Sequence, residues 1–325
     1  MFRRLAMACL CLHATLVCAG TDHAPALDQG QQQAVASAAH SAQGGSRLDF
    51  KLIAKHQHWD EPAEPFSIVG PLHFVGTGGL GSWLFATREG HILLNSGTPL
   101  SGPLIVASIR KLGFRPEDIR IIINSHAHFD HAGALGYLKQ LSGAQLAIMR
   151  EDVGVIEDGG KSDFLYGSDW PAMGQPPAQV DRVLRDGDQV RLGEVVLTAH
   201  LTAGHTRGTT TWSTTLVEDG KAYSIVFPDG TGIVPGYRVA EARAPSYPGI
   251  EADYRRTLHT LEMLKPDIWL SHHTPQCGLE AKRERATSEG IAAWVDPEGY
   301  RQFVAAKRRA FEDQMDEQMK QPTED

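Results

Sequence analysis

The sequence has few cysteines, no clusters of positive charge and few long apolar runs. Three of the four cysteines in the 325 residues fall within the first 18, which leaves Cys277 alone in the rest of the chain. A single thiol cannot form an internal disulfide, so the fold must depend on its hydrophobic core. The formal charge is −8, and no run of Lys or Arg is long enough to follow a phosphate backbone. We therefore expect no nucleic-acid partner.

The longest apolar run lies at the start of the chain. Arg3 and Arg4 precede a mostly apolar stretch over 5–17, and small residues follow it. This order is typical of a secretory signal peptide, and the stretch is too short to span a membrane. We expect residues 1–20 to be removed on export to a bacterial periplasm. The mature protein is then expected to be a monomer without a membrane attachment.

The remaining chain divides into a short leader and one large domain. Residues 21–46 are rich in Ala, Gln, Gly and Ser without periodicity, which indicates a flexible leader. Over the whole chain, 42% of residues are hydrophobic and 22% charged, as in ordinary soluble domains. We therefore expect one domain over 47–325, ending in a helix over 297–319. Charges at i, i+4 spacing predict that this last helix is a solvated surface helix.

Strand and helix patterns alternate in both halves of that domain. Helical spacing predicts helices over 104–112, 132–141 and 252–264. Short apolar runs predict strands over 72–75, 82–86, 92–94, 119–124, 190–198, 209–216 and 222–227. The run over 119–124 is almost entirely β-branched, which is typical of a strand buried on both faces. This alternation predicts sheets covered by helices.

One glycine motif is excluded as a nucleotide site. Gly76, Gly78 and Gly81 match the Gly-x-Gly-x-x-Gly spacing of dinucleotide-binding folds. That motif needs a following helix, whose N-terminus receives the pyrophosphate. Here a strand-like run over 82–86 follows instead, so the segment is interpreted as part of a hairpin.

The segment after the predicted strand over 119–124 carries a dense set of metal-binding side chains. His126, His128, Asp130 and His131 fall within six residues. Imidazole nitrogen and carboxylate oxygen are the ligands of catalytic zinc, and a strand end can hold such groups rigidly within reach of solvent. A chance surface cluster is the alternative, but three adjacent histidines contribute little to packing. The segment therefore predicts a metal site.

Two further histidine segments follow apolar runs later in the chain. His205 lies in a Gly-His-Thr turn, and His272 and His273 end the run that begins at Asp267. Alone, each would more simply be a hydrogen-bonded structural residue. If the strand ends meet at one rim, these residues complete a metal site with an open coordination position. The remaining histidines have no motif and are interpreted as surface or structural residues: His56, His58, His73, His91, His200 and His259 among them.

These segments resemble a known family. The run His-x-His-x-Asp-His over 126–131 matches the motif of the metallo-β-lactamase superfamily, and His205 and His273 match its later ligands. The resemblance covers roughly residues 59–290. Accessory stretches similar to subclass B3 are Trp59, 158–167, 185–188, 235–237 and 247–250.

The resemblance implies an α/β fold, an αββα sandwich in which two mixed β-sheets pack face to face with helices on their outer faces. It also implies two zinc ions between the sheets. The first zinc would be held by His126, His128 and His205. The second would be held by Asp130, His131 and His273. His273 is preferred to its neighbour His272 from its spacing to Asp267.

The implied activity is hydrolysis of the β-lactam amide bond of penicillins, cephalosporins and carbapenems, which confers antibiotic resistance. A metal-bound hydroxide would attack the lactam carbonyl, and Asp130 would orient it. Phe164, Tyr166 and Thr231 are expected to contact the substrate. Arg207, which follows the Gly-His-Thr turn, is expected to support the ligands by a hydrogen bond near Asp130.

One segment departs from the family pattern. Many B3 enzymes place serines where this chain has Gly230 and Gly232, so Thr231 or backbone N–H groups are expected to substitute for them. Asp229 keeps a second interpretation open. Glyoxalase II-like thioester hydrolases and lactone hydrolases of the superfamily use an aspartate in this region to bridge both metals. A non-enzymatic zinc protein is a remote alternative, because structural zinc sites are usually closed by four ligands that are commonly cysteines.

Overall fold

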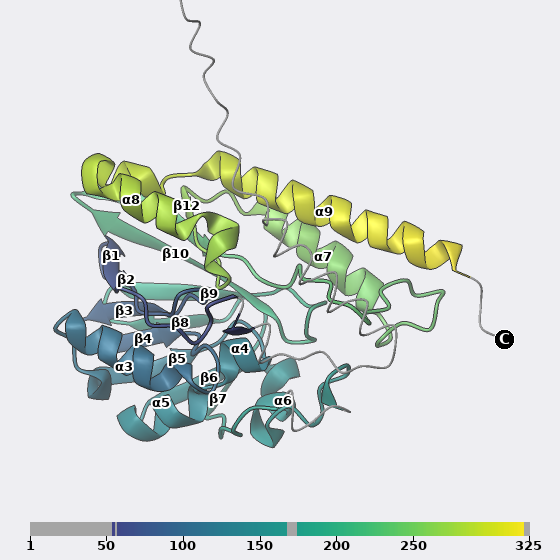
Figure 1. Cartoon of the computed structure of the whole chain (residues 1–325), viewed down its shortest axis with the longest axis horizontal. Coiled ribbons are helices and arrows are strands. Elements are labelled where there is room, and N and C mark those ends of the chain that lie inside the picture. The colour runs from purple at the N-terminus through teal and green to yellow at the C-terminus, as the bar shows by residue number, and fades with distance from the viewer. Residues whose placement is uncertain (1–53, 56, 168–173, 322–325) are drawn as a thin grey trace, which may run out of the picture.

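The computed structural model describes residues 54–55, 57–167 and 174–321, and two β-sheets packed face to face form its centre (Figure 1). The signal peptide expected over 1–20 and the leader expected over 21–46 lie outside these residues. The expected αββα sandwich of two mixed sheets is confirmed.

The first sheet has seven strands in the order of the chain. They are β1 (Phe66–Val69), β2 (Leu72–Phe74), β3 (Trp83–Thr87), β4 (Gly90–Leu94), β5 (Ile119–Ile123), β6 (Gln145–Met149) and β7 (Arg182–Leu184). The strands β1 to β4 pair antiparallel, whereas β4 to β7 pair parallel. The strand β5 is therefore central, as its β-branched sequence predicts.

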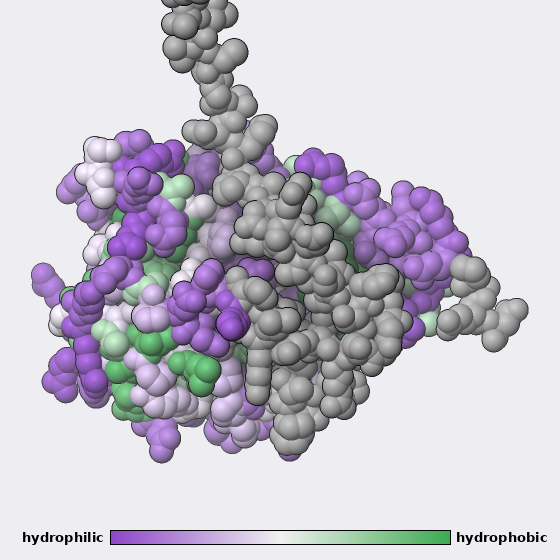
Figure 2. Space-filling view, viewed as in Figure 1, coloured by the Kyte–Doolittle hydropathy of each residue, from purple (hydrophilic) through white to green (hydrophobic). Residues whose placement is uncertain are grey.

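Helices cover the outer face of this first sheet. They are α3 (Ser101–Lys111), α4 (Phe129–Ala132), α5 (Leu135–Ser142) and α6 (Val153–Asp158). Ile105 and Ile109 of α3 and Leu138 of α5 are fully buried in one cluster with side chains of the sheet. Figure 2 shows hydrophobic surface in the part of this view where α3 and α5 lie. Leu100, which precedes α3, and Tyr137 of α5 are exposed.

The second sheet has five strands in the order β12-β11-β10-β9-β8. Their bounds are β8 (Gln189–Leu192), β9 (Val195–Leu201), β10 (Thr210–Glu218), β11 (Lys221–Phe227) and β12 (Ile268–Trp269). Only β11 and β12 pair parallel. On the side of this sheet lie the helices α7 (Ile250–Met263), α8 (Leu279–Glu289) and α9 (Pro297–Lys320) (Figure 1).

Three sequence predictions need correction. The single strand expected over 190–198 is a hairpin of β8 and β9, which turns at Gly193 with a positive φ of 55°. The helix expected over 132–141 is divided into α4 and α5 at Gly133. The long helix α9 is not solvated on all sides, because Tyr300, Val304 and Phe311 are buried on one face.

The core between the sheets is aromatic. Trp83 and Phe85 of β3 pack against Phe227 of β11, with ring centroids 5.6 and 5.8 Å apart. Trp212 of β10 is fully buried, and its indole N–H donates a 3.0 Å hydrogen bond to the carbonyl of Asn124. Burying each such side chain stabilises the fold by about 1.5–3 kcal/mol. The bond from Trp212 also ties the second sheet to the segment that leaves β5.

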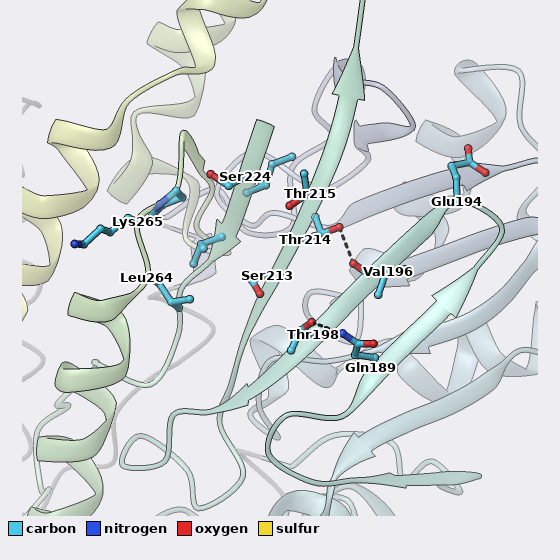
Figure 3. A pocket seen from close by; sticks show the side chains of 13 residues that line it. Gln189, Glu194, Val196, Thr198, Ser213, Thr214, Thr215, Ser224, Leu264 and Lys265 are labelled. Atoms are coloured by element: carbon cyan, nitrogen blue, oxygen red, sulfur yellow. Dashed lines mark hydrogen bonds between the residues drawn. The ribbon is translucent and has the colours of Figure 1, made fainter. Parts of the chain in front are cut away.

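A groove of about 400 Å³ lies over the second sheet beside Leu264 and Lys265 (Figure 3). Hydroxyl groups of Thr198, Ser213 and Ser224 contribute to its lining, which includes no histidine. It is therefore separate from the histidine segments. Among the described residues, no helix is both long and apolar enough to cross a membrane.

Candidate metal centre

The motif segment begins where β5 ends, and buried polar contacts hold it in place. The backbone N–H of Ser125 donates to Asn95 Oδ1 at 2.8 Å, and that of Ala127 donates to Asp152 Oδ2 at 3.0 Å. Asp130 and His131 then lie within α4. These bonds fix the backbone on both sides of His126, so its ring has little freedom.

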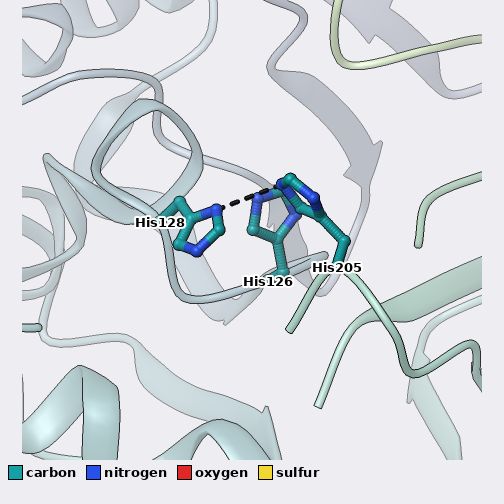
Figure 4. Close-up of side chains that lie close together, drawn as sticks. All are labelled: His126, His128 and His205. Carbon is teal, nitrogen blue, oxygen red and sulfur yellow. Dashed lines mark hydrogen bonds between the residues drawn. The ribbon is translucent and has the colours of Figure 1, made fainter. Parts of the chain in front are cut away.

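Three histidine rings converge in the first group. His126, His128 and His205 point toward one another (Figure 4), and their nearest ligand atoms all lie within 4.8 Å of each other. His128 Nδ1 lies 3.1 Å from His205 Nε2. Two imidazole nitrogens face each other at this distance when they share a proton or a cation. The structure therefore brings together all three residues expected to hold the first zinc.

Each ring of this group is held from behind by an acceptor. His126 Nδ1 donates to Asp229 Oδ2 at 2.9 Å, and His205 Nδ1 donates to the Gly232 carbonyl at 2.8 Å. His128 Nε2 lies 3.4 Å from Asp163 Oδ2. Such contacts select the tautomer of a histidine and orient its other nitrogen toward a metal.

The second group is centred on Asp130. Its Oδ2 atom lies 3.6 Å from His131 Nε2 and 3.5 Å from His273 Nε2. His131 is fixed from behind by a 2.8 Å hydrogen bond between its Nδ1 and Ser125 Oγ. The side chain of His273 is 34% exposed, and its ring packs against Trp59 at 5.5 Å. The structure thus brings together the three residues expected to hold the second zinc.

The neighbouring His272 has a different position. Its Nδ1 lies 2.6 Å from the Gly81 carbonyl, and its Nε2 lies 2.8 Å from the Asp130 carbonyl. Backbone oxygens therefore lie directly in front of both nitrogens, so neither nitrogen is open to a metal. This geometry favours His273 over His272, in agreement with the preference drawn from spacing.

Burial keeps most of these histidines neutral, the form that can bind a metal. It lowers the pKa of His131, His205 and His273, and it lowers the pKa of His272 to about 4. His126 differs. Burial is the largest single effect on it, but the charge and hydrogen bond of Asp229, together with the charges of Asp130 and Asp152, outweigh burial and raise its pKa.

The buried carboxylates that back the histidines are ionised. Burial alone would raise the pKa of Asp229, but the charge and hydrogen bond of His126 lower it. Burial likewise opposes the hydrogen bond and charge of His128 and two backbone N–H groups at Asp163, and together these bring its pKa down to about 2. The centre therefore places the neutral rings of His131, His205 and His273 near the ionised carboxylates of Asp229 and Asp163, a combination that suits a divalent cation.

The residues present fit a metal. The Nε2 atoms of His126 and His131 are buried and have no hydrogen-bond partner among the described residues. An unpaired buried polar atom costs free energy unless something binds it. A cation coordinated by these nitrogens removes that cost.

Some supporting residues gave no signal in the sequence. The buried carboxylate of Asp152 accepts from Ala127 N and from Thr206 Oγ1 and Gly208 N, so it joins the two segments of the first group. Asp163 and Ser125 were also not identified. All three lack a motif of their own, and only the contacts of the fold reveal their partners.

Of the three residues expected to contact substrate, Tyr166 lies directly beside a metal-centre ring. Tyr166 packs against the His128 ring at 5.2 Å, whereas Phe164 contacts Tyr237 and Tyr247. Thr231 is half-buried and precedes Gly232, whose carbonyl accepts a hydrogen bond from His205. The guanidinium of Arg207 lies over the ring of Tyr247 at 4.8 Å. Within residues 57–167 and 174–321, Arg207 forms no hydrogen bond near Asp130, so the expected support for the ligands is not seen there.

The two glycines that depart from the B3 pattern have structural causes. Gly230 has a positive φ of 94°, and a Cβ there would meet the Thr202 carbonyl at 2.0 Å. A Cβ at Gly232 would lie 3.0 Å from His205 Nδ1. A serine is excluded at Gly230 and crowded at Gly232, because these positions let the backbone approach the ligand loop closely.

Comparison with known proteins places the chain in a family. Residues 76–214 match the metallo-β-lactamase superfamily. The native FEZ-1 metallo-β-lactamase from Legionella gormanii is 41% identical, with a TM-score of 0.77 over 80% of this chain and 98% of that one. A class B3 di-zinc metallo-β-lactamase, LRA-12 from an Alaskan soil metagenome, is 30% identical, with a TM-score of 0.74 over 79% of this chain and 96% of that one. The chain belongs to the metallo-β-lactamase superfamily and resembles its class B3 members.

A curated relative is similar over a shorter stretch. A probable metallo-hydrolase from Burkholderia pseudomallei is 32% identical over 148 residues, which is 45% of this chain and 48% of that protein. The chain thus spans about half the length of this relative. The fold and these similarities place the chain among the metallo-hydrolases, a metal-dependent family, and its histidine-rich centre fits that class.

Proposed function

We propose that this protein is a zinc-dependent β-lactamase that opens the cyclic amide of penicillins, cephalosporins and carbapenems. The proposal rests on the convergence of six side chains, those of His126, His128, Asp130, His131, His205 and His273. Their metal-binding atoms lie close together, and hydrogen-bond acceptors orient several of the rings. The similarity to solved β-lactamases over nearly their whole length supports the choice of substrate.

In the proposed site, His126, His128 and His205 hold one zinc ion, and Asp130, His131 and His273 hold a second. When bound, the ions act as Lewis acids and lower the pKa of water. The protein supplies the geometry of the reaction. Asp130 orients the attacking water, and Tyr166, beside the His128 ring, restricts access to the cleft together with Phe164.

Thr231 is proposed to contact the substrate from the glycine loop that follows Asp229. We further propose that the enzyme acts as a monomer in the periplasm after loss of residues 1–20, and that it confers antibiotic resistance. N-terminal sequencing of exported protein tests the cleavage. Growth of a producing strain on a carbapenem tests the resistance.

The alternative, a thioester or lactone hydrolase, depends on Asp229 as a bridging ligand. The Oδ2 atom of Asp229 lies 2.9 Å from His126 Nδ1 and 3.6 Å from His131 Nδ1. Both are the nitrogens that face away from the proposed metals. This position favours a supporting role for Asp229 and therefore favours the β-lactamase.

The test is hydrolysis of a carbapenem and of a chromogenic cephalosporin by the purified protein, before and after chelation. Turnover that stops with chelator and returns with zinc, at about two zinc ions per chain, supports the proposal. A folded, zinc-loaded protein that opens neither ring overturns it. Thioester and lactone substrates would then be assayed on the same preparation.

A further inference from the structure

The segment that joins β11 to α7 holds His205 in two ways. Over 228–249, all of which the structure describes, this segment contains neither helix nor strand. Its Gly232 carbonyl accepts the hydrogen bond from His205 Nδ1 at 2.8 Å. The hydroxyl of Tyr237 donates to the backbone carbonyl of His205, and the two ring centroids lie 5.8 Å apart. Both the ring and the backbone of this ligand therefore depend on the position of an irregular segment.

Gln318, near the end of α9, supplies hydrogen bonds to the backbone of this segment. Its Oε1 accepts from Val239 N at 2.8 Å and from Ala240 N at 3.0 Å, and its Nε2 donates to the Tyr237 carbonyl at 2.6 Å. Val239 and Ala240 are fully buried, and Gln318 itself is 5% exposed. Buried backbone groups outside helices and strands need such partners, because an unpaired group costs free energy. The far end of the chain thus fixes the backbone at Tyr237.

A glutamine suits this position for a chemical reason. Its amide oxygen accepts two hydrogen bonds while its nitrogen donates another, and the side chain carries no charge that burial would penalise. The three bonds lie on the backbone from Tyr237 to Ala240, so they determine where the Tyr237 hydroxyl points. That hydroxyl meets His205, and a continuous chain of contacts therefore runs from α9 to a metal ligand.

A second contact of α9 reaches the same ligand. Phe311, two turns before Gln318, stacks on Tyr254 of α7 with ring centroids 5.6 Å apart. The hydroxyl of Tyr254 donates at 2.6 Å to the Gly232 carbonyl, the same oxygen that accepts from His205. The last turns of α9 are therefore packed against both parts of the support behind His205.

The ligands of the second group have other supports. His131 is held by the 2.8 Å hydrogen bond to Ser125 Oγ, and the ring of His273 packs on Trp59. Neither support belongs to the segment over 228–249. A displacement of Tyr237 should therefore affect His205 and leave the second group in place.

We propose that Gln318 is a positioning residue for the first metal site: through the backbone of Tyr237 it holds His205 in line with His126 and His128, and it thereby sets the affinity of that site for zinc. This inference rests on the zinc sites of the proposed function. The C-terminal helix, besides covering the second sheet, is on this view part of the metal-binding machinery.

The experiment measures the zinc affinity of one site at a time. His273→Ala removes a ligand of the second site and His126→Ala removes one of the first, and competition with a chromogenic chelator gives the affinity of the site that remains. Gln318→Met is introduced into both backgrounds, because methionine keeps the length of the side chain and removes all three hydrogen bonds. We expect the affinity of the first site to fall roughly 10-fold, as for other groups that orient metal ligands, and that of the second to change by less than about 2-fold.

Tyr237→Phe tests the route of the effect. It removes the hydroxyl that meets His205 and leaves the backbone bonds of Gln318 in place. If Gln318 acts through this hydroxyl, the double variant should lose no more affinity at the first site than the weaker single variant, because contacts in one connected series are not additive. Losses that multiply would overturn the route through Tyr237.

Matched variants make the result specific to Gln318. Gln302→Met changes an exposed glutamine of the same helix, whose amide donates to Glu298 at 3.0 Å, and should leave both affinities unchanged. Urea unfolding of the metal-free protein checks each variant. If Gln318→Met does not fold, it is replaced by Gln318→Glu, which keeps the acceptor for Val239 and Ala240.

Two results would overturn the role of Gln318: a wild-type affinity at the first site, or equal losses at the two sites, which would indicate a general effect on the fold. The proposed function is judged separately. A wild-type protein that binds zinc at both sites and opens no β-lactam ring overturns that function, whereas the affinities still decide the role of Gln318.

Discussion

Two groups of buried histidines in this chain can be compared directly. At the metal centre, five rings and Asp130 converge. At the other group, His73 and His91 both pack against Phe114, with ring centroids 5.0 and 5.3 Å from it. Burial lowers the pKa of histidines in both groups, and that of His73 falls to about 4. Neutral buried imidazoles are therefore common to both.

The difference lies in what surrounds the rings. His126 and His128 each face a buried carboxylate, and their remaining nitrogens point to a shared volume. His73 instead pairs with the hydroxyl of Ser67 at 3.0 Å. Burial alone thus makes a histidine neutral, whereas carboxylates behind the ring and convergence in front of it make a metal ligand.

The largest expected effect is the loss of a ring in the first group. His126→Ala should lower β-lactam turnover by roughly 1000-fold or more, because a lost ion removes several kcal/mol of transition-state stabilisation. Turnover and zinc per chain are measured together. His73→Phe is the matched control, since it changes a buried histidine outside the centre. Equal turnover in both variants would remove the distinction between the two groups.

Metal removal should separate the two halves of the centre. The rings of the first group are buried or half-buried and each has an acceptor behind it, whereas His273 is 34% exposed and packs on Trp59. We expect increasing chelator to release one zinc before the other, with the ion at Asp130, His131 and His273 leaving first. Zinc per chain after dialysis against graded chelator is the measurement. Release of both ions in a single step would contradict it.

A smaller loss of activity is expected when the hydrogen-bond acceptor behind a histidine ring is changed and the ring itself is kept. Asp229→Asn keeps the size of the side chain but weakens its bond to His126 Nδ1. We expect roughly a 10- to 100-fold loss in zinc affinity or turnover, typical of such supporting residues. Asp163→Asn should cost less, because its contact with His128 is longer, at 3.4 Å. A loss for Asp229→Asn as large as that for His126→Ala would instead indicate a direct ligand.

The smallest expected effect is on the free energy of unfolding at acidic pH. The pKa of His73 is lowered in the folded state, so the unfolded state binds the proton first, and stability falls as pH drops from 6.5 toward 4. Between pH 6.5 and 5, His73→Phe should lose about 2 kcal/mol less unfolding free energy than the wild type. Urea unfolding of zinc-loaded protein at both pH values measures this. Equal losses of unfolding free energy in the variant and the wild type would argue against His73 as a source of this pH dependence.

The site was more accessible to sequence reasoning than parts of the fold. The strand β5 and the ligands that follow it could be predicted, because a β-branched run and a dense His/Asp motif are local signals. The strands β1, β6, β7 and β12 were missed. Three of them, β1, β7 and β12, have only two to four residues, which carry too little periodicity. The hairpin of β8 and β9 was taken as one strand because a glycine turn inside an apolar run interrupts the pattern only briefly.

By itself, the sequence determined which residue types were available for a metal and where each strand that presents them ends. Only the tertiary structure decided that His273 rather than His272 faces Asp130, and that Asp229 stands behind His126. The physical reason is distance along the chain. Asp229 follows His126 by 103 residues, and no local pattern encodes a hydrogen bond between groups that meet only when two sheets pack together.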